Sequence, residues 1–130
     1  MQEIQAHARE GYPNEVVGIL AGDRRSRSVV RAEPLVNEHV DRLRDRYHVD
    51  GLALLRAERR LRVEGLLAVG YYHSHPDHPA RFSAFDLQHA QPGMSYLILS
   101  VCAGEVVEVQ SWRLTDDGTD MRAEAIEIGE

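Results

Sequence analysis

The chain has 130 residues and a mass of 14.7 kDa, which suits one domain of ordinary size and leaves no room for two independent cores. Its 43% apolar and 28% charged residues are typical of a folded globular protein and exclude a disordered one. The 15 basic and 21 acidic residues give a net charge of −6, which argues against a nucleic-acid-binding domain, because such a domain carries a basic patch. No apolar run reaches the ~18 residues of a membrane span. The single Cys102 excludes an internal disulfide and suits a reducing cytoplasm.

Hydrophobic periodicity and turn residues divide the chain into alternating helices and strands. Helices are predicted over residues 1–10, 51–63 and 83–91, and the second begins after an Asp50 N-cap. Strands are predicted over residues 15–22, 28–36, 66–72, 96–101, 105–114 and 121–128, with a polar loop at 37–50. This order predicts a single three-layer α/β domain over residues 1–130, with a mixed sheet flanked by helices.

Histidines gather directly after the third predicted strand, where His73, His75 and His78 lie within six positions. Residues two apart in an extended chain face the same side, so His73 and His75 can converge on one point. Two neutral imidazoles, one carboxylate and a water make the open coordination of a catalytic zinc site. Asp86, at the start of the next helix, is the candidate third ligand, and we predict one zinc per chain. His78 is interpreted as an exposed loop residue and not as a ligand.

The same residues have simpler explanations. Ser83 and Asp86 have the spacing of a capping box, with Ser at the N-cap and an acid at N3. We expect the two roles of Asp86 to compete, because a carboxylate that folds back as a cap is then withdrawn from a metal. His73 and His75 could be hydrogen-bonded residues at a strand end. Cys102 is interpreted as a small buried hydrophobe, and His7, His39, His48 and His89 as mostly surface residues.

A longer pattern resembles a known family. The string His73-x-His75-Pro76, six residues, Ser83, two residues, Asp86 resembles the signature of the JAMM metalloproteases, the catalytic MPN+ domains. Upstream, the segment at 15–22, Glu-Val-Val-Gly-Ile-Leu-Ala-Gly, is similar to the segment that brings that family's catalytic Glu. The likeness to small prokaryotic members continues to Ser-Trp-Arg-Leu at 111–114 and so covers most of the chain.

Two positions depart from the family pattern. Val17 stands where many prokaryotic relatives have Cys, at a position that is interpreted as structural. Relatives usually begin with a strand before the first helix, so either that strand is missing here or the start is truncated. An uncovered sheet edge would result and would favour a homodimer.

The resemblance implies a fold and a role for each motif residue. The fold would be the MPN/JAB type, which is similar to cytidine deaminases. His73, His75 and Asp86 would hold Zn²⁺ with a water in the fourth position. Glu15 would take the proton of that water, and Ser83 would hydrogen-bond the oxyanion of the tetrahedral intermediate. Without the resemblance, Glu15 could not be chosen from the other acids.

The activity that the resemblance implies is a zinc-dependent peptidase or isopeptidase acting after the C-terminal Gly-Gly of a ubiquitin-like or sulfur-carrier protein. We expect a cytoplasmic enzyme that binds neither nucleic acid nor membrane, and residues 37–47 are the candidate contact for the carrier protein. The alternatives are a non-catalytic MPN-type scaffold and a zinc peptidase of small peptides. A zinc deaminase of similar architecture needs a Pro-Cys-x-x-Cys pair, which one cysteine cannot provide.

Overall fold

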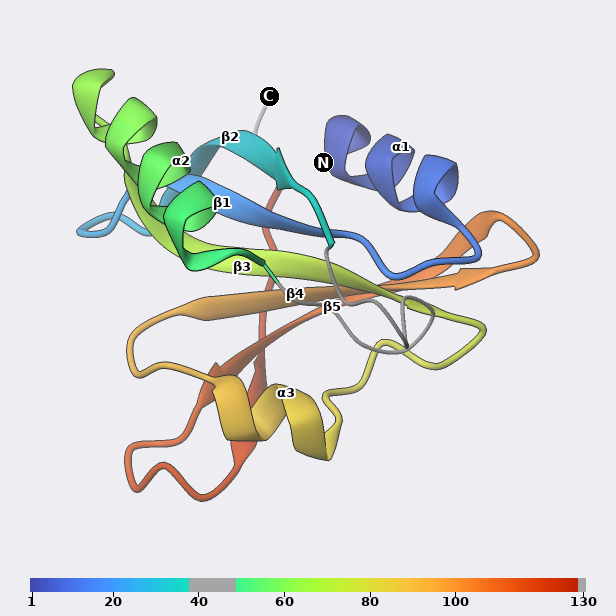
Figure 1. Cartoon of the computed structure of the whole chain (residues 1–130). Helices are drawn as coiled ribbons and strands as arrows, with labels where there is room; N and C mark the ends of the chain where they lie inside the picture. Colours follow the sequence, from blue (N-terminus) through green and yellow to red (C-terminus); the bar gives the residue numbers. More distant parts are fainter. Residues whose placement is uncertain (38–48, 129–130) are drawn as a thin grey trace.

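The fold is built on one six-stranded sheet, shown in Figure 1. The computed structural model describes residues 1–37 and 49–128. In chain order the elements are α1 (Gln2–Gly11), β1 (Val17–Asp23), β2 (Ser28–Leu35), α2 (Gly51–Val63), β3 (Leu67–Pro76), α3 (Ala84–His89), β4 (Ser95–Cys102), β5 (Glu105–Leu114) and β6 (Met121–Glu124). The strand order is β2-β1-β3-β4-β5-β6, and β3 and β4 are parallel while all other neighbours are antiparallel. The predicted α/β domain with a mixed sheet is confirmed.

Helices cover both faces of the sheet because neighbouring side chains of β1 point to opposite sides. Leu20 packs with Ile4 and Ala8 of α1, in a cluster that extends to Leu99 of β4. Ile19 packs on the other face with a cluster that includes Leu61 of α2. The two helices lie over different parts of the sheet (Figure 1). The layered arrangement therefore follows from the alternating apolar residues of the central strands.

The helix α2 was predicted with the bounds that the structure has. It begins after Asp50, whose side chain accepts a hydrogen bond from the Ala53 N–H at 3.1 Å. Arg60 and Arg62 lie in its last turn, where positive charge interacts favourably with the C-terminal end of the helix dipole. Local signals are sufficient here because the cap and the apolar face lie within one short segment.

Three predictions at strand ends are wrong. The strand predicted to end at Tyr72 continues to Pro76, because β4 pairs with it in register from Gly70↔Ser95 to Pro76↔Val101. The last strand stops at Glu124, because β5 pairs with it only as far as Ser111. Cys102 is half-buried at the end of β4, and not a buried core residue.

The edges of the sheet are β2 and β6 within the part of the chain that the structure describes. The predicted homodimer through an open edge stays a prediction. The polar segment at 38–48 lies outside the described residues, so most of the predicted carrier contact does too. Among the helices of residues 1–37 and 49–128, none has the length and apolar character needed to cross a bilayer.

Candidate metal centre

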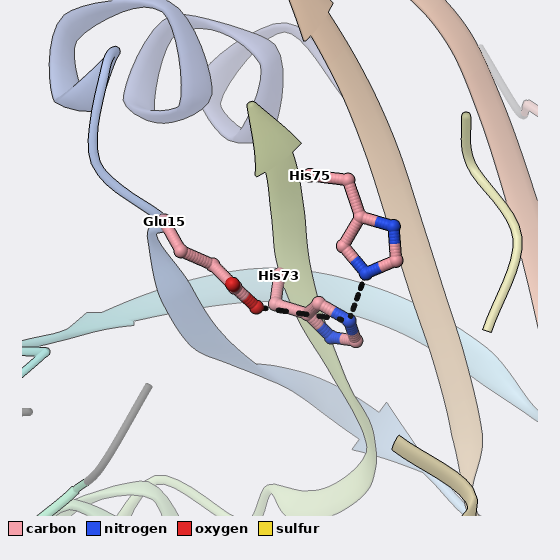
Figure 2. Close-up of side chains that lie close together, drawn as sticks. All are labelled: Glu15, His73 and His75. Atoms are coloured by element: carbon pink, nitrogen blue, oxygen red, sulfur yellow. Dashed lines mark hydrogen bonds and ion pairs between the residues drawn. The ribbon is translucent and has the colours of Figure 1, made fainter. Parts of the chain in front are cut away.

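Two histidines of the central strand β3 form the middle of the site. His73 pairs with Val17 of β1 on one side and with Ile98 of β4 on the other, so its backbone is fixed by both neighbours. The residues His73 and His75 are 1% and 9% exposed. Their Nε2 atoms lie 3.2 Å apart, as the dashed line in Figure 2 marks. The predicted convergence of the two imidazoles is confirmed.

The orientation of the His75 ring is set by a backbone carbonyl. Its Nδ1 lies 2.9 Å from the carbonyl oxygen of Pro79, which can only accept a hydrogen bond. Nδ1 must therefore carry a proton, and this hydrogen bond fixes the ring with Nε2 directed toward His73 and Asp86. A hydrogen bond of this kind to the remote nitrogen is what metal-ligating histidines in general require.

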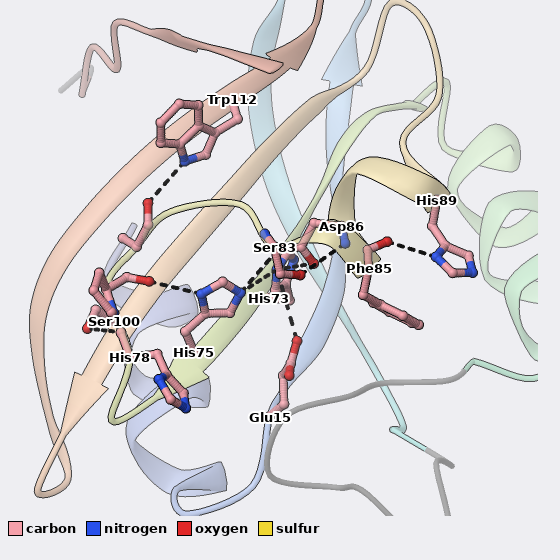
Figure 3. A network of polar contacts seen from close by, with 12 residues as sticks. Glu15, His73, His75, His78, Ser83, Phe85, Asp86, His89, Ser100 and Trp112 are labelled. Carbon is pink, nitrogen blue, oxygen red and sulfur yellow. Dashed lines mark hydrogen bonds and ion pairs between the residues drawn. The ribbon is translucent and has the colours of Figure 1, made fainter. Parts of the chain in front are cut away.

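Asp86 reaches both histidines from the first turn of α3. Its Oδ1 lies 3.1 Å from His73 Nε2, and its Oδ2 lies 3.2 Å from His75 Nε2. The carboxylate is 5% exposed. Three residues from two elements thus face one another, and their ligand atoms make contacts of 3.1–3.2 Å (Figure 3).

The same carboxylate also caps the helix. Asp86 Oδ2 accepts from the Ser83 N–H at 2.8 Å, and Ser83 Oγ accepts from the Asp86 N–H at 3.1 Å, which completes a capping box. The expectation that capping would withdraw Asp86 from the histidines is wrong. A carboxylate has about four lone-pair sites, so one oxygen can accept from the cap while both remain directed at the imidazoles.

These contacts decide the protonation of Asp86. Burial by itself raises the pKa of its carboxyl, but the charge of His73 and hydrogen bonds from both histidines and the Ser83 backbone outweigh burial. They hold the pKa of Asp86 well below its usual range. Asp86 is therefore a carboxylate, the form that binds cations.

Glu15 approaches from the residue pair that precedes β1. Its Oε1 lies 4.0 Å from His73 Nε2, and the residue is 4% exposed (Figure 2). Ligand atoms of Glu15, His73 and His75 all lie within 4.8 Å of one another. Asn37 donates to the Glu15 carbonyl oxygen at 2.9 Å and so helps to fix the backbone there.

The donor set and its spacing fit a tetrahedral zinc ion. Zn–N and Zn–O distances of about 2.0–2.1 Å place neighbouring ligand atoms of a tetrahedron about 3.3–3.4 Å apart. The two Nε2 atoms are 3.2 Å apart, and Asp86 Oδ1 and Oδ2 lie 3.1 Å from His73 Nε2 and 3.2 Å from His75 Nε2 respectively. Glu15 Oε1 is farther from His73 Nε2, at 4.0 Å. Asp86 therefore fits better than Glu15 as the third ligand beside the two histidines.

Other candidate residues lie outside this cluster. His78 is exposed, as predicted, and His89 is exposed with Nδ1 at 2.8 Å from the Phe85 carbonyl oxygen. His7 is not a surface residue, because it is half-buried with Nδ1 at 2.7 Å from the Tyr72 hydroxyl. His39 and His48 fall outside the described residues.

Two residues that sequence reasoning missed support the cluster. Ser74, between the two histidines, is fully buried, and its Oγ accepts from the Val16 N–H at 2.9 Å. Pro79 provides the carbonyl that orients His75. The alternating pattern could have pointed to Ser74, because a polar residue on the buried face of a central strand needs a hydrogen-bond partner.

Comparison with known proteins identifies the family. The family described as prokaryotic homologs of the JAB domain matches residues 1–115, and the chain belongs to it. It is 41% identical over 98 residues to a probable TtuB-protein conjugate cleaving protease of Thermus thermophilus, covering 75% of this chain and 64% of that protein. It is 40% identical over 102 residues to a desampylase of Haloferax volcanii, covering 75% of this chain and 73% of that protein.

Solved structures share the fold. A solution structure of a Desulfitobacterium hafniense protein is similar with a TM-score of 0.80 and 35% identity, covering all of this chain and 88% of that one. The crystal structure of a JAB1/MPN domain protein from Archaeoglobus fulgidus has a TM-score of 0.60 at 18% identity, covering 99% of this chain and 93% of that one. The predicted family and fold are therefore confirmed.

Proposed function

We propose that this chain is a zinc-dependent peptidase of the JAMM type that hydrolyses the amide after the C-terminal Gly-Gly of a ubiquitin-like or sulfur-carrier protein. The observation that carries the proposal is the meeting of two imidazoles and one carboxylate at 3.1–3.2 Å, with a second carboxylate 4.0 Å away. The substrate class is supported by two relatives, one named for the cleavage of protein conjugates and the other named a desampylase.

In the proposed mechanism His73, His75 and Asp86 hold the zinc. When bound, zinc polarises a carbonyl and lowers the pKa of a coordinated water to about 7. Glu15 lies beside this triad and not within it, so its carboxylate can accept the proton of the attacking water. It then returns the proton to the nitrogen of the leaving amine, as a general acid–base residue does.

In the proposed mechanism, Ser83 would stabilise developing negative charge. Its hydroxyl oxygen accepts the Asp86 N–H in the capping box, which leaves the hydroxyl proton to be donated. Ser83 is exposed, whereas Asp86 three residues later is buried. The hydroxyl can thus donate a hydrogen bond to the oxyanion from the solvent side of the centre.

Burial of the centre favours a slender substrate. Four residues of the centre are 1–9% exposed, His73, His75, Asp86 and Glu15, so a bulky chain cannot approach them without rearrangement. Glycine has no side chain and adopts conformations closed to other residues, so a Gly-Gly tail is the segment that reaches a narrow site with least hindrance. Pairing of that tail with a strand would add main-chain hydrogen bonds.

The test is cleavage of a carrier-protein conjugate ending in Gly-Gly, followed by mass spectrometry in zinc and in chelator. Glu15→Gln should keep the fold and the zinc but lose ~10²- to 10⁴-fold in rate, because the amide cannot accept the proton. The exposed Glu10 provides the matched control, and Glu10→Gln should cleave at the wild-type rate. His75→Ala should lose zinc as measured by elemental analysis.

Three outcomes would contradict the proposal in different ways. Cleavage by Glu15→Gln at the wild-type rate would make Glu15 structural. Equal cleavage of a conjugate whose last Gly is changed to Val would favour a peptidase of small peptides. A wild-type protein that binds no zinc and cleaves nothing would favour a non-catalytic scaffold.

A further inference from the structure

The segment between β3 and α3 is held by several hydrogen bonds to its backbone. Asp77 N–H donates to the Val101 carbonyl at 2.7 Å, and Ser100 Oγ donates to the His78 carbonyl. The Ala80 N–H donates to Glu108 Oε1 at 2.9 Å, and the Ala80 carbonyl accepts from Trp112 Nε1 at 3.0 Å. Figure 3 shows Trp112 and Ser100 on the strands β5 and β4 that carry these contacts.

The two hydrogen bonds of Ala80 hold the two peptide units that flank this residue. Glu108 and Trp112 both belong to β5, which is not adjacent to β3 in the sheet. Ala80 itself is 3% exposed, and the Trp112 ring meets Phe82 edge to face with centroids 5.0 Å apart. Residues 79–82 are therefore fixed to β5 by two hydrogen bonds and one aromatic contact.

The residue next to Ala80 is the one that orients His75. The Pro79 carbonyl accepts from His75 Nδ1 at 2.9 Å, and proline has no N–H of its own to anchor it. The position of this carbonyl thus depends on its neighbours along the chain. Displacement of Ala80 would move the Pro79 oxygen and release the His75 ring.

We propose that Glu108 and Trp112 are positioning residues that hold residue 80, and thereby aim His75 Nε2 at the metal centre. The inference rests on the proposed zinc site, but its structural part concerns the ring of His75 alone. It also gives a role to the Ser-Trp-Arg-Leu segment at 111–114, which the proposed chemistry does not use.

The test measures zinc affinity by chelator competition. Removing a residue that supports a metal ligand from outside the ligand shell typically lowers metal affinity 10- to 100-fold. Trp112→Phe keeps an aromatic ring against Phe82 but loses the Nε1–H donor, so it should bind zinc about 10-fold more weakly. Glu108→Ala should do the same, whereas Glu108→Gln should bind as the wild type does, because the amide oxygen still accepts from the Ala80 N–H. Glu105→Ala, an exposed residue of the same strand, is the control and should not change affinity.

The second readout is the tautomer of His75 in the metal-free protein, observed by ¹⁵N NMR of the imidazole. The wild type, Glu108→Gln and Glu105→Ala should show a protonated Nδ1, and Trp112→Phe and Glu108→Ala should show a mixture. An unchanged tautomer and unchanged zinc affinity in the two folded loss variants would overturn the proposal. If the wild type binds no zinc but the tautomer responds as expected, the proposed metal function falls while the positioning of His75 stands.

Discussion

Asp86 contacts both histidines of the proposed metal centre and also caps α3, and substitutions can separate these two roles. In Asp86→Asn, the side-chain oxygen can still accept from the Ser83 N–H, so we expect the cap to persist, while the metal-free protein loses the stabilising contacts of the carboxylate with the two histidines. A neutral amide is a poor ligand, however. Loss of a ligand should exceed the 10- to 100-fold cost of losing a partner outside the ligand shell, so zinc affinity should fall by at least about 10²-fold.

Ser83→Ala should show the opposite pattern. It removes the acceptor of the Asp86 N–H, which costs ~1 kcal/mol as other N-cap losses do, and it leaves the ligand atoms unchanged. For a chain of 130 residues that loss corresponds to a shift of about 4 °C in Tm. Zinc affinity should stay within a few-fold of the wild type.

Urea unfolding of the metal-free proteins measures how much the cap contributes to the free energy of unfolding. Thermal unfolding with added zinc measures how much bound zinc stabilises each protein. Zinc at 100 times the wild-type Kd should stabilise the wild type and Ser83→Ala by about 2.7 kcal/mol, and Asp86→Asn by no more than about 0.4 kcal/mol. Stabilisation of Asp86→Asn by the same amount would show that Asp86 only caps the helix. Loss of zinc binding in Ser83→Ala would show that the two roles cannot be separated.

The pH dependence gives an independent check on Asp86. Because the pKa of Asp86 is lowered in the folded state, its carboxylate contributes stability above the unfolded pKa of ~3.9, and this contribution is lost as pH falls below that value. The metal-free Asp86→Asn protein should therefore lose stability less steeply between about pH 4 and pH 2. An equally steep decline of the free energy of unfolding in both proteins would contradict the lowered pKa of Asp86.

Three further predictions concern stability and positioning. Leu61→Ala should destabilise by 2–5 kcal/mol in urea unfolding because Leu61 is 1% exposed, whereas Leu55→Ala, at 49% exposed, should stay within about 0.5 kcal/mol. Burial lowers the pKa of His7 despite the nearby Glu10, so stability should decrease as pH falls below ~6.5, and His7→Gln should flatten this part of the curve. Ser74→Ala leaves the buried N–H of residue 16 without its acceptor and should cost ~1–3 kcal/mol in urea unfolding.

Local sequence signals predicted the elements whose determinants are local. The Asp50 cap and the apolar face of α2 lie within 14 residues, and both bounds of that helix agree with the structure. The hairpin turn between β4 and β5 is equally local, since Ala103 and Gly104 adopt the positive φ values of 52° and 80° that a two-residue hairpin turn requires. Such features need no knowledge of the rest of the chain.

The errors arose where a distant segment decides the outcome. β3 reaches Pro76 because β4, almost twenty residues later, pairs with it in parallel. The sequence did not predict that Asp86 caps the helix and contacts the histidines at once, because the capping box is local, whereas the contact with His73 depends on where α3 packs. Glu15 could not be recognised from local spacing at all, since 58 positions separate it from His73.

The topology explains why such distant residues meet. β1 is antiparallel to β3, so the start of β1 and the end of β3 lie at the same end of the sheet, and the pair Val17↔His73 fixes their register. β4 is parallel to β3, so the chain must cross back over the sheet after β3 ends, and α3 begins at that end of the sheet. Three segments therefore meet at one end of the sheet: Glu15 lies just before β1, the histidines lie at the end of β3, and Asp86 lies in the crossover between β3 and β4. A slip of one residue between β1 and β3 would turn their side chains to opposite faces, and the hydrogen bond from the Val16 N–H to Ser74 opposes that slip beside the site.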